Sequence, residues 1–562
     1  MYIYVKFKAK RNGEKIMADY KKLADLLYPE ATLTIEEIEK KYPARNLPEG
    51  ACVTRLAPSP TGFVHLGNLF PAVTCERLSH QSGGTFILRI EDTDQKREVE
   101  GAVEILLSSL KRYNIIFDEG ATADGEVGSY GPYYQRQRAD IYKAYAKKLI
   151  AEGRAYPCFC SEERLEEMRK EQEQNKDNFG YYGKYAACSN LTYEEIEQKV
   201  KNGEKFVLRF RSQGDPSKTD HIYDLIKGRL EFPENDIDHV MLKSDGIPTY
   251  HFAHSVDEKT MGVTHVVRGE EWLATLPFHV QLFKALGFPL PKYMHVAQLT
   301  KLDNGTKRKL SKRKDPEASL AYYYEQGFSA GSVMEYIMTL LNSNFEEWRI
   351  ANPTAPLDDF KFSPDKMSIS GCLFDMDKLI DVSRNTISVM TAEDVYEQVT
   401  AWAKDNDSEL YEKFTAAPDY AKRILSIGRG CEKPRKDIAK WNEVKAYVSF
   451  FYDDLFVQSG EFPETVTAED KLEILNRYSE LYDENDDQET WFGKVTNLAE
   501  ELGFAPKTKL YKKNPELYKG HVGDVSMVLR VAITGRRNSP DLYEIMKILG
   551  ADKVKERLEK AK

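Results

Sequence analysis

Two short stretches carry side chains suited to binding the phosphates of a nucleotide. The first, His65-Leu66-Gly67-Asn68, follows a strand-like run and a Pro/Gly loop. Free N–H groups at a helix start, together with the helix dipole, attract an anion at such a corner. His65 can donate to a phosphate oxygen, Thr61 adds a hydroxyl one turn upstream, and Gly67 leaves the main chain bare for a flat base. Taken alone, an ordinary tight turn with a surface histidine would also explain this stretch.

The second stretch, TKRKLSKRKD at residues 306–315, is basic in a chain whose net charge is -10. Lys309, Ser311 and Lys312 suit a pyrophosphate leaving group, because negative charge builds on that group during attack at the α-phosphorus. A solvated basic face or a generic anion patch would give a similar composition. Each stretch alone is therefore weak evidence for a nucleotide-binding site. The occurrence of both, in this order along the chain, is stronger evidence.

The elements around these stretches predict a nucleotide-binding fold split into two halves. The run ACVTRLA reads as a strand, a helix ending at Gly83-Gly84 follows, and TFILRI reads as the next strand, which makes a βαβ unit. Strands and helices alternate to about residue 155, which favours a parallel sheet covered on both faces. Residues 156–238 have a different sequence pattern and are interpreted as an insertion. The alternation of strands and helices resumes after them. Beyond residue 301 the spacing is helical.

Bulk composition excludes several classes of protein. With 562 residues the chain is too long for a single core, and 41% hydrophobic with 30% charged residues is typical of folded soluble proteins. The negative net charge argues against non-specific coating of nucleic acid. Seven cysteines, an odd number, and no apolar run of roughly 18 residues predict a reduced cytoplasmic protein without a membrane span. Residues 1–50 are interpreted as an N-terminal extension, within which Met17 is an alternative start.

Together the two stretches resemble the paired HIGH and KMSKS motifs of class I aminoacyl-tRNA synthetases. Longer runs narrow the resemblance to glutamyl-tRNA synthetase of the bacterial type, namely RLAPSPTGFVHLGN, FILRIEDTDQKR, PTYHFAHSVDEKTMGVTHVVRGEEWL and VLRVAITGRRNSPDLYEIMKILGADKVKERL. The resemblance covers residues 53–558. It implies ATP-dependent ligation of L-glutamate to the 3′ end of tRNA-Glu through a glutamyl-adenylate, with release of AMP and pyrophosphate.

The resemblance also implies an α/β fold with a defined order of domains. A split Rossmann-like parallel-sheet catalytic domain would hold an inserted α+β domain that binds the acceptor end, and all-helical stem-contact and anticodon-binding domains would follow. The predicted ranges are 1–50 for the extension, 51–155 and 239–300 for the two catalytic halves, 156–238 for the insertion, 301–381 for the KMSKS loop with the stem-contact domain, and 382–562 for the anticodon-binding domain.

A pocket for free glutamate needs cations for its two carboxylates and an anion for its ammonium. Arginine matches a carboxylate with its planar fork, and Arg55 and Arg268 both lie on predicted strands. Ligands collect at the carboxyl ends of strands in this kind of fold, so both are expected in one crevice, with Glu91 receiving the ammonium. A structural ion pair would explain any one of them alone. Which arginine takes which carboxylate stays open, and the resemblance adds further glutamate-binding residues: Ala57, Ser59, Tyr250 and His254.

The resemblance implies that positioning and charge neutralisation, rather than a covalent nucleophile, carry the reaction. It assigns catalysis to His65, Lys309, Ser311 and Lys312, and it assigns ATP binding to Pro58, Thr61, His65, Gly67, Asn68, Glu271, Leu310 and Lys312. Asn68 stands where the motif has its final histidine, and His254 stands where some relatives have asparagine. Mg²⁺ is expected with the triphosphate and is carried mainly by the nucleotide.

Three cysteines at the start of the insertion, Cys158, Cys160 and Cys188, have a spacing that can bind structural zinc. Some members of the family hold Zn²⁺ here through cysteines and a nearby tyrosine or histidine. This chain offers Tyr185 or Asn190 in that place, and asparagine is a poor zinc ligand. A metal-free loop with reduced thiols is the alternative.

Four other functions were weighed against this interpretation. A glutaminyl-tRNA synthetase, or a non-discriminating enzyme that also charges tRNA-Gln, would share most of these motifs. A small-molecule nucleotidyltransferase would need neither the insertion nor the helical tail. A non-catalytic tRNA-binding paralogue should have lost His65, Lys312 or Glu91, and all are present. We therefore expect a monomer whose partners are ATP, L-glutamate and tRNA-Glu, with no membrane.

Overall fold

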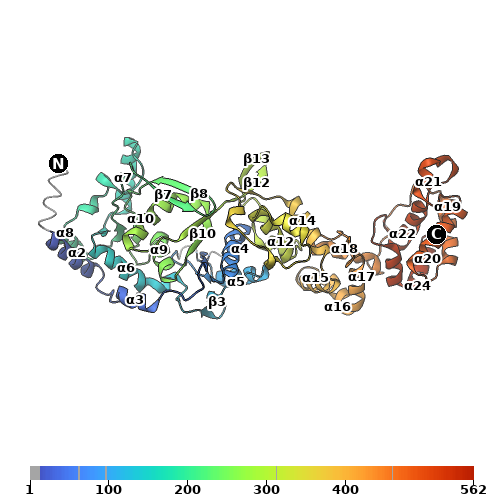
Figure 1. Ribbon diagram of the computed structural model, residues 1–562, viewed down its shortest axis with the longest axis horizontal. Helices are drawn as coiled ribbons and strands as arrows, with labels where there is room; N and C mark the ends of the chain where they lie inside the picture. Colours follow the sequence, from blue (N-terminus) through green and yellow to red (C-terminus); the bar gives the residue numbers. More distant parts are fainter. Residues whose placement is uncertain (1–12, 61–63, 95–97, 312, 459) are drawn as a thin grey trace. The chain divides into compact units, whose positions relative to one another are not determined.

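A computed structural model describes residues 13–60, 64–94, 98–311, 313–458 and 460–562 (Figure 1). The chain divides into two compact units. The first comprises Met1–Leu320, Ile337–Ala351 and Ala355–Phe374, and the second comprises Ala321–Tyr336, Asn352–Thr354 and Asp375–Lys562. Within the described ranges, no helix is long and apolar enough to cross a membrane.

The first sheet of unit 1 confirms the predicted βαβ unit. Strands β1 (Val53–Leu56), β2 (Thr85–Leu88) and β3 (Glu119–Thr122) are parallel, β4 (Gly125–Val127) is antiparallel to β3, and the helices are α4 (Leu66–Gln81) and α5 (Ala102–Arg112). Every residue of β1 and β2 is buried, as expected for parallel strands with both faces covered. Gly84 permits the turn into β2, because a Cβ there would lie 1.9 Å from the carbonyl oxygen of Cys52.

The second sheet of unit 1 has the strand order β10-β11-β7-β8. Strands β10 (His265–Gly269) and β11 (Lys292–Val296) are parallel, and they are accompanied by helices α9 (Tyr250–Thr260) and α10 (Leu276–Leu286). The hairpin of β7 (Thr219–Asp224) and β8 (Gly228–Pro233) joins this sheet where Tyr293 on β11 is paired with Asp224. The two sheets meet at β1, where the Thr264 N–H donates to the Val53 carbonyl at 3.0 Å. The two predicted halves of the nucleotide-binding fold are therefore joined at β1.

A third sheet belongs to the insertion, and its strands do not follow the predicted ranges. It consists of the antiparallel strands β5 (Ala155–Cys158), β6 (Val207–Phe210) and β9 (Val240–Leu242), with helices α6 (Ala139–Ala151), α7 (Glu162–Asn175) and α8 (Tyr193–Lys201) nearby in sequence. Strand β9 was expected in the second catalytic half, whereas the β7–β8 hairpin was expected in the insertion. Both strands of that hairpin alternate in exposure, which predicts a strand but cannot identify the sheet that it joins.

The described part of the N-terminal extension, residues 13–50, is packed into unit 1. Helices α2 (Gly13–Leu27) and α3 (Ile35–Lys41) bury Leu27 and Ile38 in the same apolar core as Leu149 of α6. Thr34 and Glu37 form a capping box that starts α3. Beyond α3, Arg45 binds Glu119 with both ends of its fork, at 2.8 and 2.9 Å. The described part of the extension thus shares its apolar core with the rest of unit 1.

A small three-stranded sheet carries the second basic motif. Strands β12 (Leu299–Asp303) and β13 (Thr306–Lys309) form an antiparallel hairpin, and β14 (Cys372–Leu373) pairs with β12. Helices α11 (Leu320–Glu325), α12 (Ala330–Leu341) and α13 (Phe345–Ala351) follow the hairpin in sequence.

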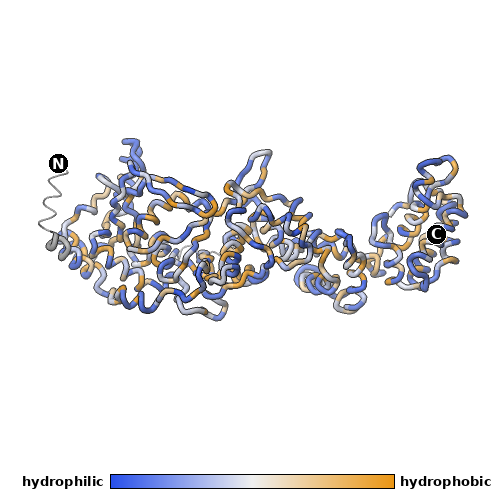
Figure 2. The backbone as a smooth tube through the Cα atoms, viewed as in Figure 1, coloured by the Kyte–Doolittle hydropathy of each residue, from blue (hydrophilic) through white to orange (hydrophobic). Residues whose placement is uncertain are grey.

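Unit 2 is helical and has its own apolar core, which extends in sequence from Ile387 to Leu558. Along its helices, polar and apolar residues alternate in the way that one buried face requires (Figure 2). Besides α11 and the first part of α12, these helices are α14 (Met376–Ser388), α15 (Ala392–Asn406), α16 (Ser408–Ala416), α17 (Pro418–Ser426), α18 (Val444–Val448), α19 (Ala468–Leu481), α20 (Gln488–Glu501), α21 (Thr508–Lys513), α22 (Val522–Thr534), α23 (Leu542–Leu549) and α24 (Ala551–Lys560).

Candidate functional site

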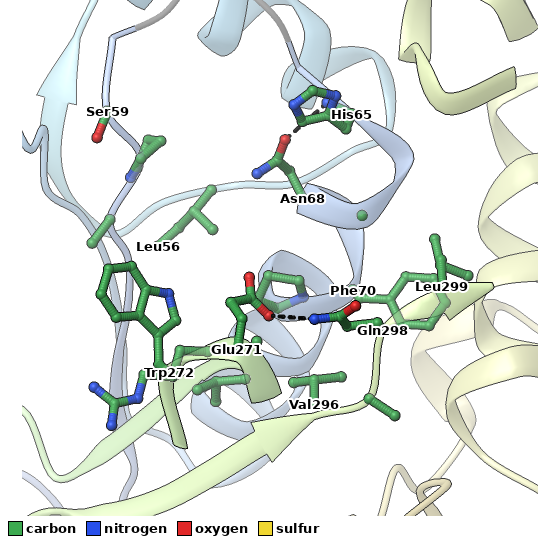
Figure 3. Close-up of a pocket in the computed structure, with 18 of the residues that line it drawn as sticks. Leu56, Ser59, His65, Asn68, Phe70, Glu271, Trp272, Val296, Gln298 and Leu299 are labelled. Atoms are coloured by element: carbon green, nitrogen blue, oxygen red, sulfur yellow. Dashed lines mark hydrogen bonds between the residues drawn. The ribbon is translucent and has the colours of Figure 1, made fainter. Parts of the chain in front are cut away.

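A cavity of about 500 Å³ opens in unit 1 beyond the carboxyl ends of β1 and β10 (Figure 3). Most of the predicted site residues line it: Arg55, Ala57, Pro58, Ser59, His65, Gly67, Asn68, Glu91, Tyr250, Arg268, Glu271, Lys309 and Leu310. Thr61 and Lys312 lie outside the described residues. Ser311 and His254 do not line the cavity. Segments more than 250 residues apart in sequence therefore meet around one space.

The helix start at His65 forms one wall of the cavity. His65 is the N-cap of α4, and its backbone N–H donates to Asn68 Oδ1 at 2.8 Å (Figure 3). Asn68 thus caps the helix, which gives a structural reason for asparagine at this position. A Cβ built on Gly67 would meet no atom within 4 Å, so the space beside that residue is open. This wall therefore has room for a flat ring. The N-terminus of α4 is directed at the same space.

Arg55 is held from behind by a buried carboxylate. Its Nε donates to Glu258 Oε1 at 2.8 Å and its Nη1 to the Val267 carbonyl at 3.0 Å. Arg89 Nη2 donates to the same Glu258 oxygen at 3.0 Å and to Glu91 Oε1 at 3.3 Å. Burial opposes ionisation of Glu258, but Arg55 and Arg89 together hold its pKa well below its usual range. Glu258 thus balances two buried cations.

Arg268, on β10, has a different environment. Its Nε donates to His295 Nε2 at 3.0 Å and its Nη1 to His279 Nδ1 at 3.1 Å. Among the described residues its buried Nη2 has no hydrogen-bond partner, and no carboxylate forms an ion pair with it. The Nη2 amino group of a charged side chain that lines the cavity is therefore unused, and an acceptor from a ligand would satisfy it.

Glu91 is the carboxylate that faces these arginines inside the cavity. Burial raises its pKa to about 7, against the lowering effect of Arg89 and Arg55. Near neutral pH this carboxyl group is therefore poised between its charged and neutral forms.

The β12–β13 hairpin brings the second motif to the cavity. Lys309 ends β13 and lines the cavity, while the Leu310 N–H donates to the Leu299 carbonyl at 3.0 Å. Asp315 anchors the following loop, since it accepts the Ser311 N–H at 2.8 Å and both ends of the Arg308 fork at 2.6 and 2.7 Å. The Arg308 contact lowers the pKa of Asp315 to about 2. Ser311 is thus held by Asp315 at the base of the loop.

His254 lies one layer behind the cavity wall. It is fully buried, its Nε2 shares a hydrogen bond with Tyr293 Oη at 3.0 Å, and its ring is stacked on Tyr250 at 5.7 Å. Burial lowers its pKa to about 3, so the ring is neutral. The structure places His254 in support of Tyr250, which itself lines the cavity.

Trp272 and Gln298 are among the lining residues that were not predicted from the sequence. The Trp272 ring packs on Tyr250 at 4.2 Å, and Gln298 Nε2 donates to Glu271 Oε2 at 3.4 Å (Figure 3). Trp272 directly follows Glu271 in the motif RGEEWL, so its position beside a predicted ATP-binding residue was an available signal. Gln298 comes from a segment without a recognisable pattern.

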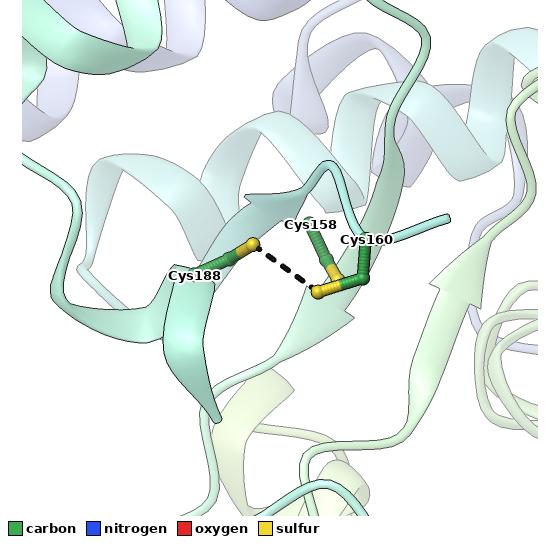
Figure 4. Close-up of side chains that lie close together, drawn as sticks. All are labelled: Cys158, Cys160 and Cys188. Atoms are coloured by element: carbon green, nitrogen blue, oxygen red, sulfur yellow. Dashed lines mark hydrogen bonds between the residues drawn. The ribbon is translucent and has the colours of Figure 1, made fainter. Parts of the chain in front are cut away.

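The three predicted cysteines come together at the end of β5 (Figure 4). Their Sγ atoms all lie within 4.8 Å of one another, and those of Cys160 and Cys188 are 3.6 Å apart. Tyr181 Oη lies 3.3 Å from Cys160 Sγ, whereas Tyr185 donates to Asp177 at 2.6 Å. The tyrosine oxygen beside the thiols is therefore that of Tyr181. Hydrogen bonds from Cys160 and Cys188 lower the pKa of the Cys158 thiol.

Unit 2 has a cavity of its own, of about 760 Å³, between α20, α22 and α23. An aromatic pair, Trp491 and Phe492, lines it together with Ser526, Arg530 and Asp541. Phe492 is 47% exposed, which is high for a phenylalanine. The combination of an exposed ring with donors and acceptors suits a ligand that has a flat face and a polar edge.

Comparisons with known proteins agree with this architecture. The family described as tRNA synthetases class I (E and Q), catalytic domain, matches residues 51–361, and an anticodon binding domain matches residues 516–562. The glutamate–tRNA ligase of Acetivibrio thermocellus is 55% identical over 96% of this chain and 100% of its own. That of Clostridium perfringens strain 13 is 48% identical over 96% and 100%. The solved glutamate–tRNA synthetase from Elizabethkingia anophelis has a TM-score of 0.70 and 26% identity, covering 91% of this chain and 99% of that one.

Proposed function

Since this chain belongs to the glutamate–tRNA ligases of class I, we propose that the cavity of unit 1 binds glutamate and ATP side by side. The enzyme charges glutamate onto tRNA. The observation that carries the assignment of the site is the meeting of the His65 corner and the Lys309 hairpin around one cavity that also contains two arginines and a glutamate. The α-carboxylate of glutamate would attack the α-phosphorus of ATP, pyrophosphate would leave, and a ribose hydroxyl of the tRNA end would then take the glutamyl group.

We assign the glutamate subsite to the end that contains Arg55, Arg268 and Glu91. The unused Nη2 of Arg268 supports this assignment, because a carboxylate is the acceptor that best satisfies it. Glu91 in its charged form would receive the ammonium. Ala57, Ser59 and Tyr250 would complete the walls.

We assign the ATP subsite to the His65 wall and the hairpin opposite. The open space at Gly67 would take the adenine, while His65 and Asn68 lie at the helix N-terminus near the phosphates, with Pro58 and Glu271 nearby. Lys309, Leu310, Ser311 and Lys312 would hold the departing pyrophosphate. Mg²⁺ would arrive with the triphosphate and neutralise part of its charge.

The assignment is tested by ATP–pyrophosphate exchange with glutamate and with glutamine, each with and without tRNA. Exchange that needs glutamate and is abolished in Lys309→Ala is the expected result. Exchange driven by glutamine alone would contradict the glutamate subsite. Charging assays with tRNA-Glu and tRNA-Gln then establish whether the second tRNA is also a substrate, and sedimentation tests the monomer that we propose.

Glutamate binding should weaken as the pH falls below neutrality. Glu91 has a raised pKa of about 7, so it loses its charge on acidification and can no longer pair with the ammonium. We expect the KM for glutamate to rise by up to about tenfold for each pH unit below 7.

The same raised pKa means that the stability Glu91 contributes is fully present below its unfolded pKa and is lost as the pH rises through 7.

Steady-state exchange between pH 5.5 and 8.5 measures this dependence. Glu91→Gln should have a high KM that no longer varies with pH. The control is Glu231→Gln, which alters an exposed carboxylate paired with Arg229 on the β8 strand. A KM for glutamate that is flat across this range in the native enzyme would contradict the role of Glu91.

We propose that Cys158, Cys160 and Cys188 bind one structural Zn²⁺, with Tyr181 Oη or water as the fourth ligand. Three convergent sulfur atoms suit tetrahedral zinc, which binds thiolates. Purified protein should contain about one zinc ion per chain, measured by elemental analysis, and Cys188→Ser should lose it. Cys431→Ser, at an exposed cysteine, is the matched control and should retain the metal. Native protein without zinc after purification in zinc-supplemented medium would exclude the site.

We propose that the cavity of unit 2 binds an anticodon base, stacked on Phe492. Stacking of a base on an aromatic ring contributes about 1–3 kcal/mol, so Phe492→Ala should raise the KM for tRNA by roughly 5- to 150-fold. Pyrophosphate exchange is expected to keep its KM for glutamate. Leu472→Ala, which removes another exposed apolar side chain from a helix of this unit, is the control. An unchanged KM for tRNA would remove Phe492 from the interface.

A further inference from the structure

We propose that two chains of hydrogen bonds hold Arg268 in the orientation that binds a substrate carboxylate. One chain leads from Arg268 through His295 to Asp224, and the other leads through His279 to His251. Asp224 and the three histidines would thus be positioning residues for the glutamate subsite. This inference rests on the proposed function of the cavity, because it presumes that Arg268 contacts glutamate.

The direction of the first chain follows from the chemistry of arginine, which only donates. Arg268 Nε donates to His295 Nε2 at 3.0 Å, so that nitrogen accepts and the ring proton must be on Nδ1. His295 Nδ1 then donates to Asp224 Oδ2 at 2.7 Å. Burial opposes ionisation of Asp224, but the His295 bond and the neighbouring backbone N–H groups lower its pKa. Each atom along this chain therefore has one defined role.

Asp224 is itself fixed by the turn of the β7–β8 hairpin. Its Oδ1 accepts the backbone N–H groups of Ile226 at 2.9 Å and Lys227 at 2.8 Å. The His295 backbone N–H also donates to Oδ2, at 3.1 Å. A fully buried carboxylate with this number of donors has a single orientation, and it passes that orientation to the imidazole.

The second chain has an equally defined direction. Arg268 Nη1 donates to His279 Nδ1 at 3.1 Å, so His279 carries its proton on Nε2 and donates to His251 Nδ1 at 2.9 Å. Burial lowers the pKa of His279 well below its usual range and that of His251 to about 4. Both rings are therefore neutral at physiological pH, and His279 can accept from Arg268 only in this tautomer.

The two chains leave Arg268 with a full charge and, among the described residues, an unpartnered Nη2 amino group. The hydrogen bonds at its Nε and Nη1 go to neutral imidazoles, and the carboxylate of Asp224 is separated from it by His295. Arg55 differs, because its Nε contacts the ionised Glu258 at 2.8 Å. A guanidinium that is positioned but not neutralised attracts an incoming carboxylate more strongly than one already paired. The histidines thus orient the Arg268 guanidinium without neutralising its positive charge.

Asp224→Asn tests the first chain with little change of shape. The amide oxygen can keep the bonds to Ile226 and Lys227, but its NH₂ would then face His295 Nδ1. His295 would have to accept there and carry its proton on Nε2, directed at the Arg268 Nε–H. We expect the KM for glutamate to rise by about tenfold or more, with the KM for ATP within about twofold of native, because only the orientation of Arg268 changes.

The second chain is tested by a pair of variants at His279. In His279→Asn the amide oxygen can take the place of Nδ1 and accept from Arg268, whereas His279→Leu removes the acceptor. The KM for glutamate should rise by about tenfold or more in the leucine variant and be largely restored in the asparagine variant. A purely structural role would not separate the two in this way. Circular dichroism melting of all variants shows that each remains folded.

Two control variants make the same kinds of substitution, one at an aspartate and one at a histidine. Both leave the two chains of hydrogen bonds intact. Asp220→Asn removes a carboxylate of the same strand, β7, that pairs with Lys284. His265→Gln replaces a buried histidine on β10, the strand of Arg268. Both should keep the native KM for glutamate. If Asp224→Asn and His279→Leu do so too while Arg268→Ala raises it, the positioning role is wrong. If Arg268→Ala also has no effect, the proposed glutamate subsite fails instead.

Discussion

Arg268→Ala is expected to raise the KM for glutamate by about a hundredfold, with a smaller effect on kcat at saturating glutamate. A hydrogen bond to a charged group contributes about 1.5–3 kcal/mol, and each 1.36 kcal/mol corresponds to a factor of about ten. The loss falls on KM because the arginine would bind the carboxylate equally in the ground state and in the transition state. Arg268→Lys should recover little, since a lysine ammonium cannot present the planar fork that meets His295 and His279 together.

Pyrophosphate exchange at saturating ATP with tRNA present provides the measurement. Arg229→Ala, at an exposed arginine of the β8 strand, is the matched control and should leave the KM unchanged. If Arg268→Ala lowers kcat and leaves the KM for glutamate at its native value, the residue acts on the reacting phosphate and the glutamate subsite must be reassigned.

Local patterns predicted the parts of the fold that depend on neighbouring residues. The βαβ unit from β1 to β2 follows from two buried apolar runs and a helix between them, and the structure has those elements. Arg55 and Arg268 each lie one residue before the end of a strand, Glu91 follows β2, and the carboxyl ends of parallel strands meet at one edge. Their convergence was therefore predictable without a structure. Cys158 and Cys160 are neighbours in sequence, and the structure brings Cys188, 28 residues further on, to within 3.6 Å of Cys160.

Long-range pairing is the part that the sequence did not provide. The β7–β8 hairpin is a recognisable strand pair, but its partner β11 lies some 70 residues further along the chain, as the Asp224 and His295 contact illustrates. Asp224 gave no signal, because its role depends on that pairing. His254 was placed among glutamate-binding residues, whereas its position on α9 directs it behind Tyr250. Helical spacing alone cannot distinguish a residue that faces a cavity from one that packs a layer deeper.

The second large effect is expected at Glu258, on the stability of unit 1. Glu258→Leu would leave Arg55 and Arg89 buried without the carboxylate oxygen that both contact, at 2.8 and 3.0 Å. Breaking a buried charge pair by removing one partner costs about 3–5 kcal/mol, and here two cations lose the same partner. Glu258→Gln keeps an acceptor but not the charge, so its effect should be smaller. Exposed pairs are worth at most about 1 kcal/mol, so Glu231→Gln is the matched control.

Glu258 also links stability to the pH dependence of glutamate binding. Burial is the main cause of the raised pKa of Glu91, Arg89 and Arg55 lower that pKa, and Glu258 adds a smaller rise. In Glu258→Gln, both arginines would act on Glu91 without the competing negative charge of Glu258, so the pKa of Glu91 should fall. Tight glutamate binding should then persist at a lower pH than in the native enzyme. Calorimetry and pH-dependent exchange on the same variant measure the two effects together. A destabilised variant whose pH dependence is unchanged would mean that Glu258 supports the fold but does not act on the pocket.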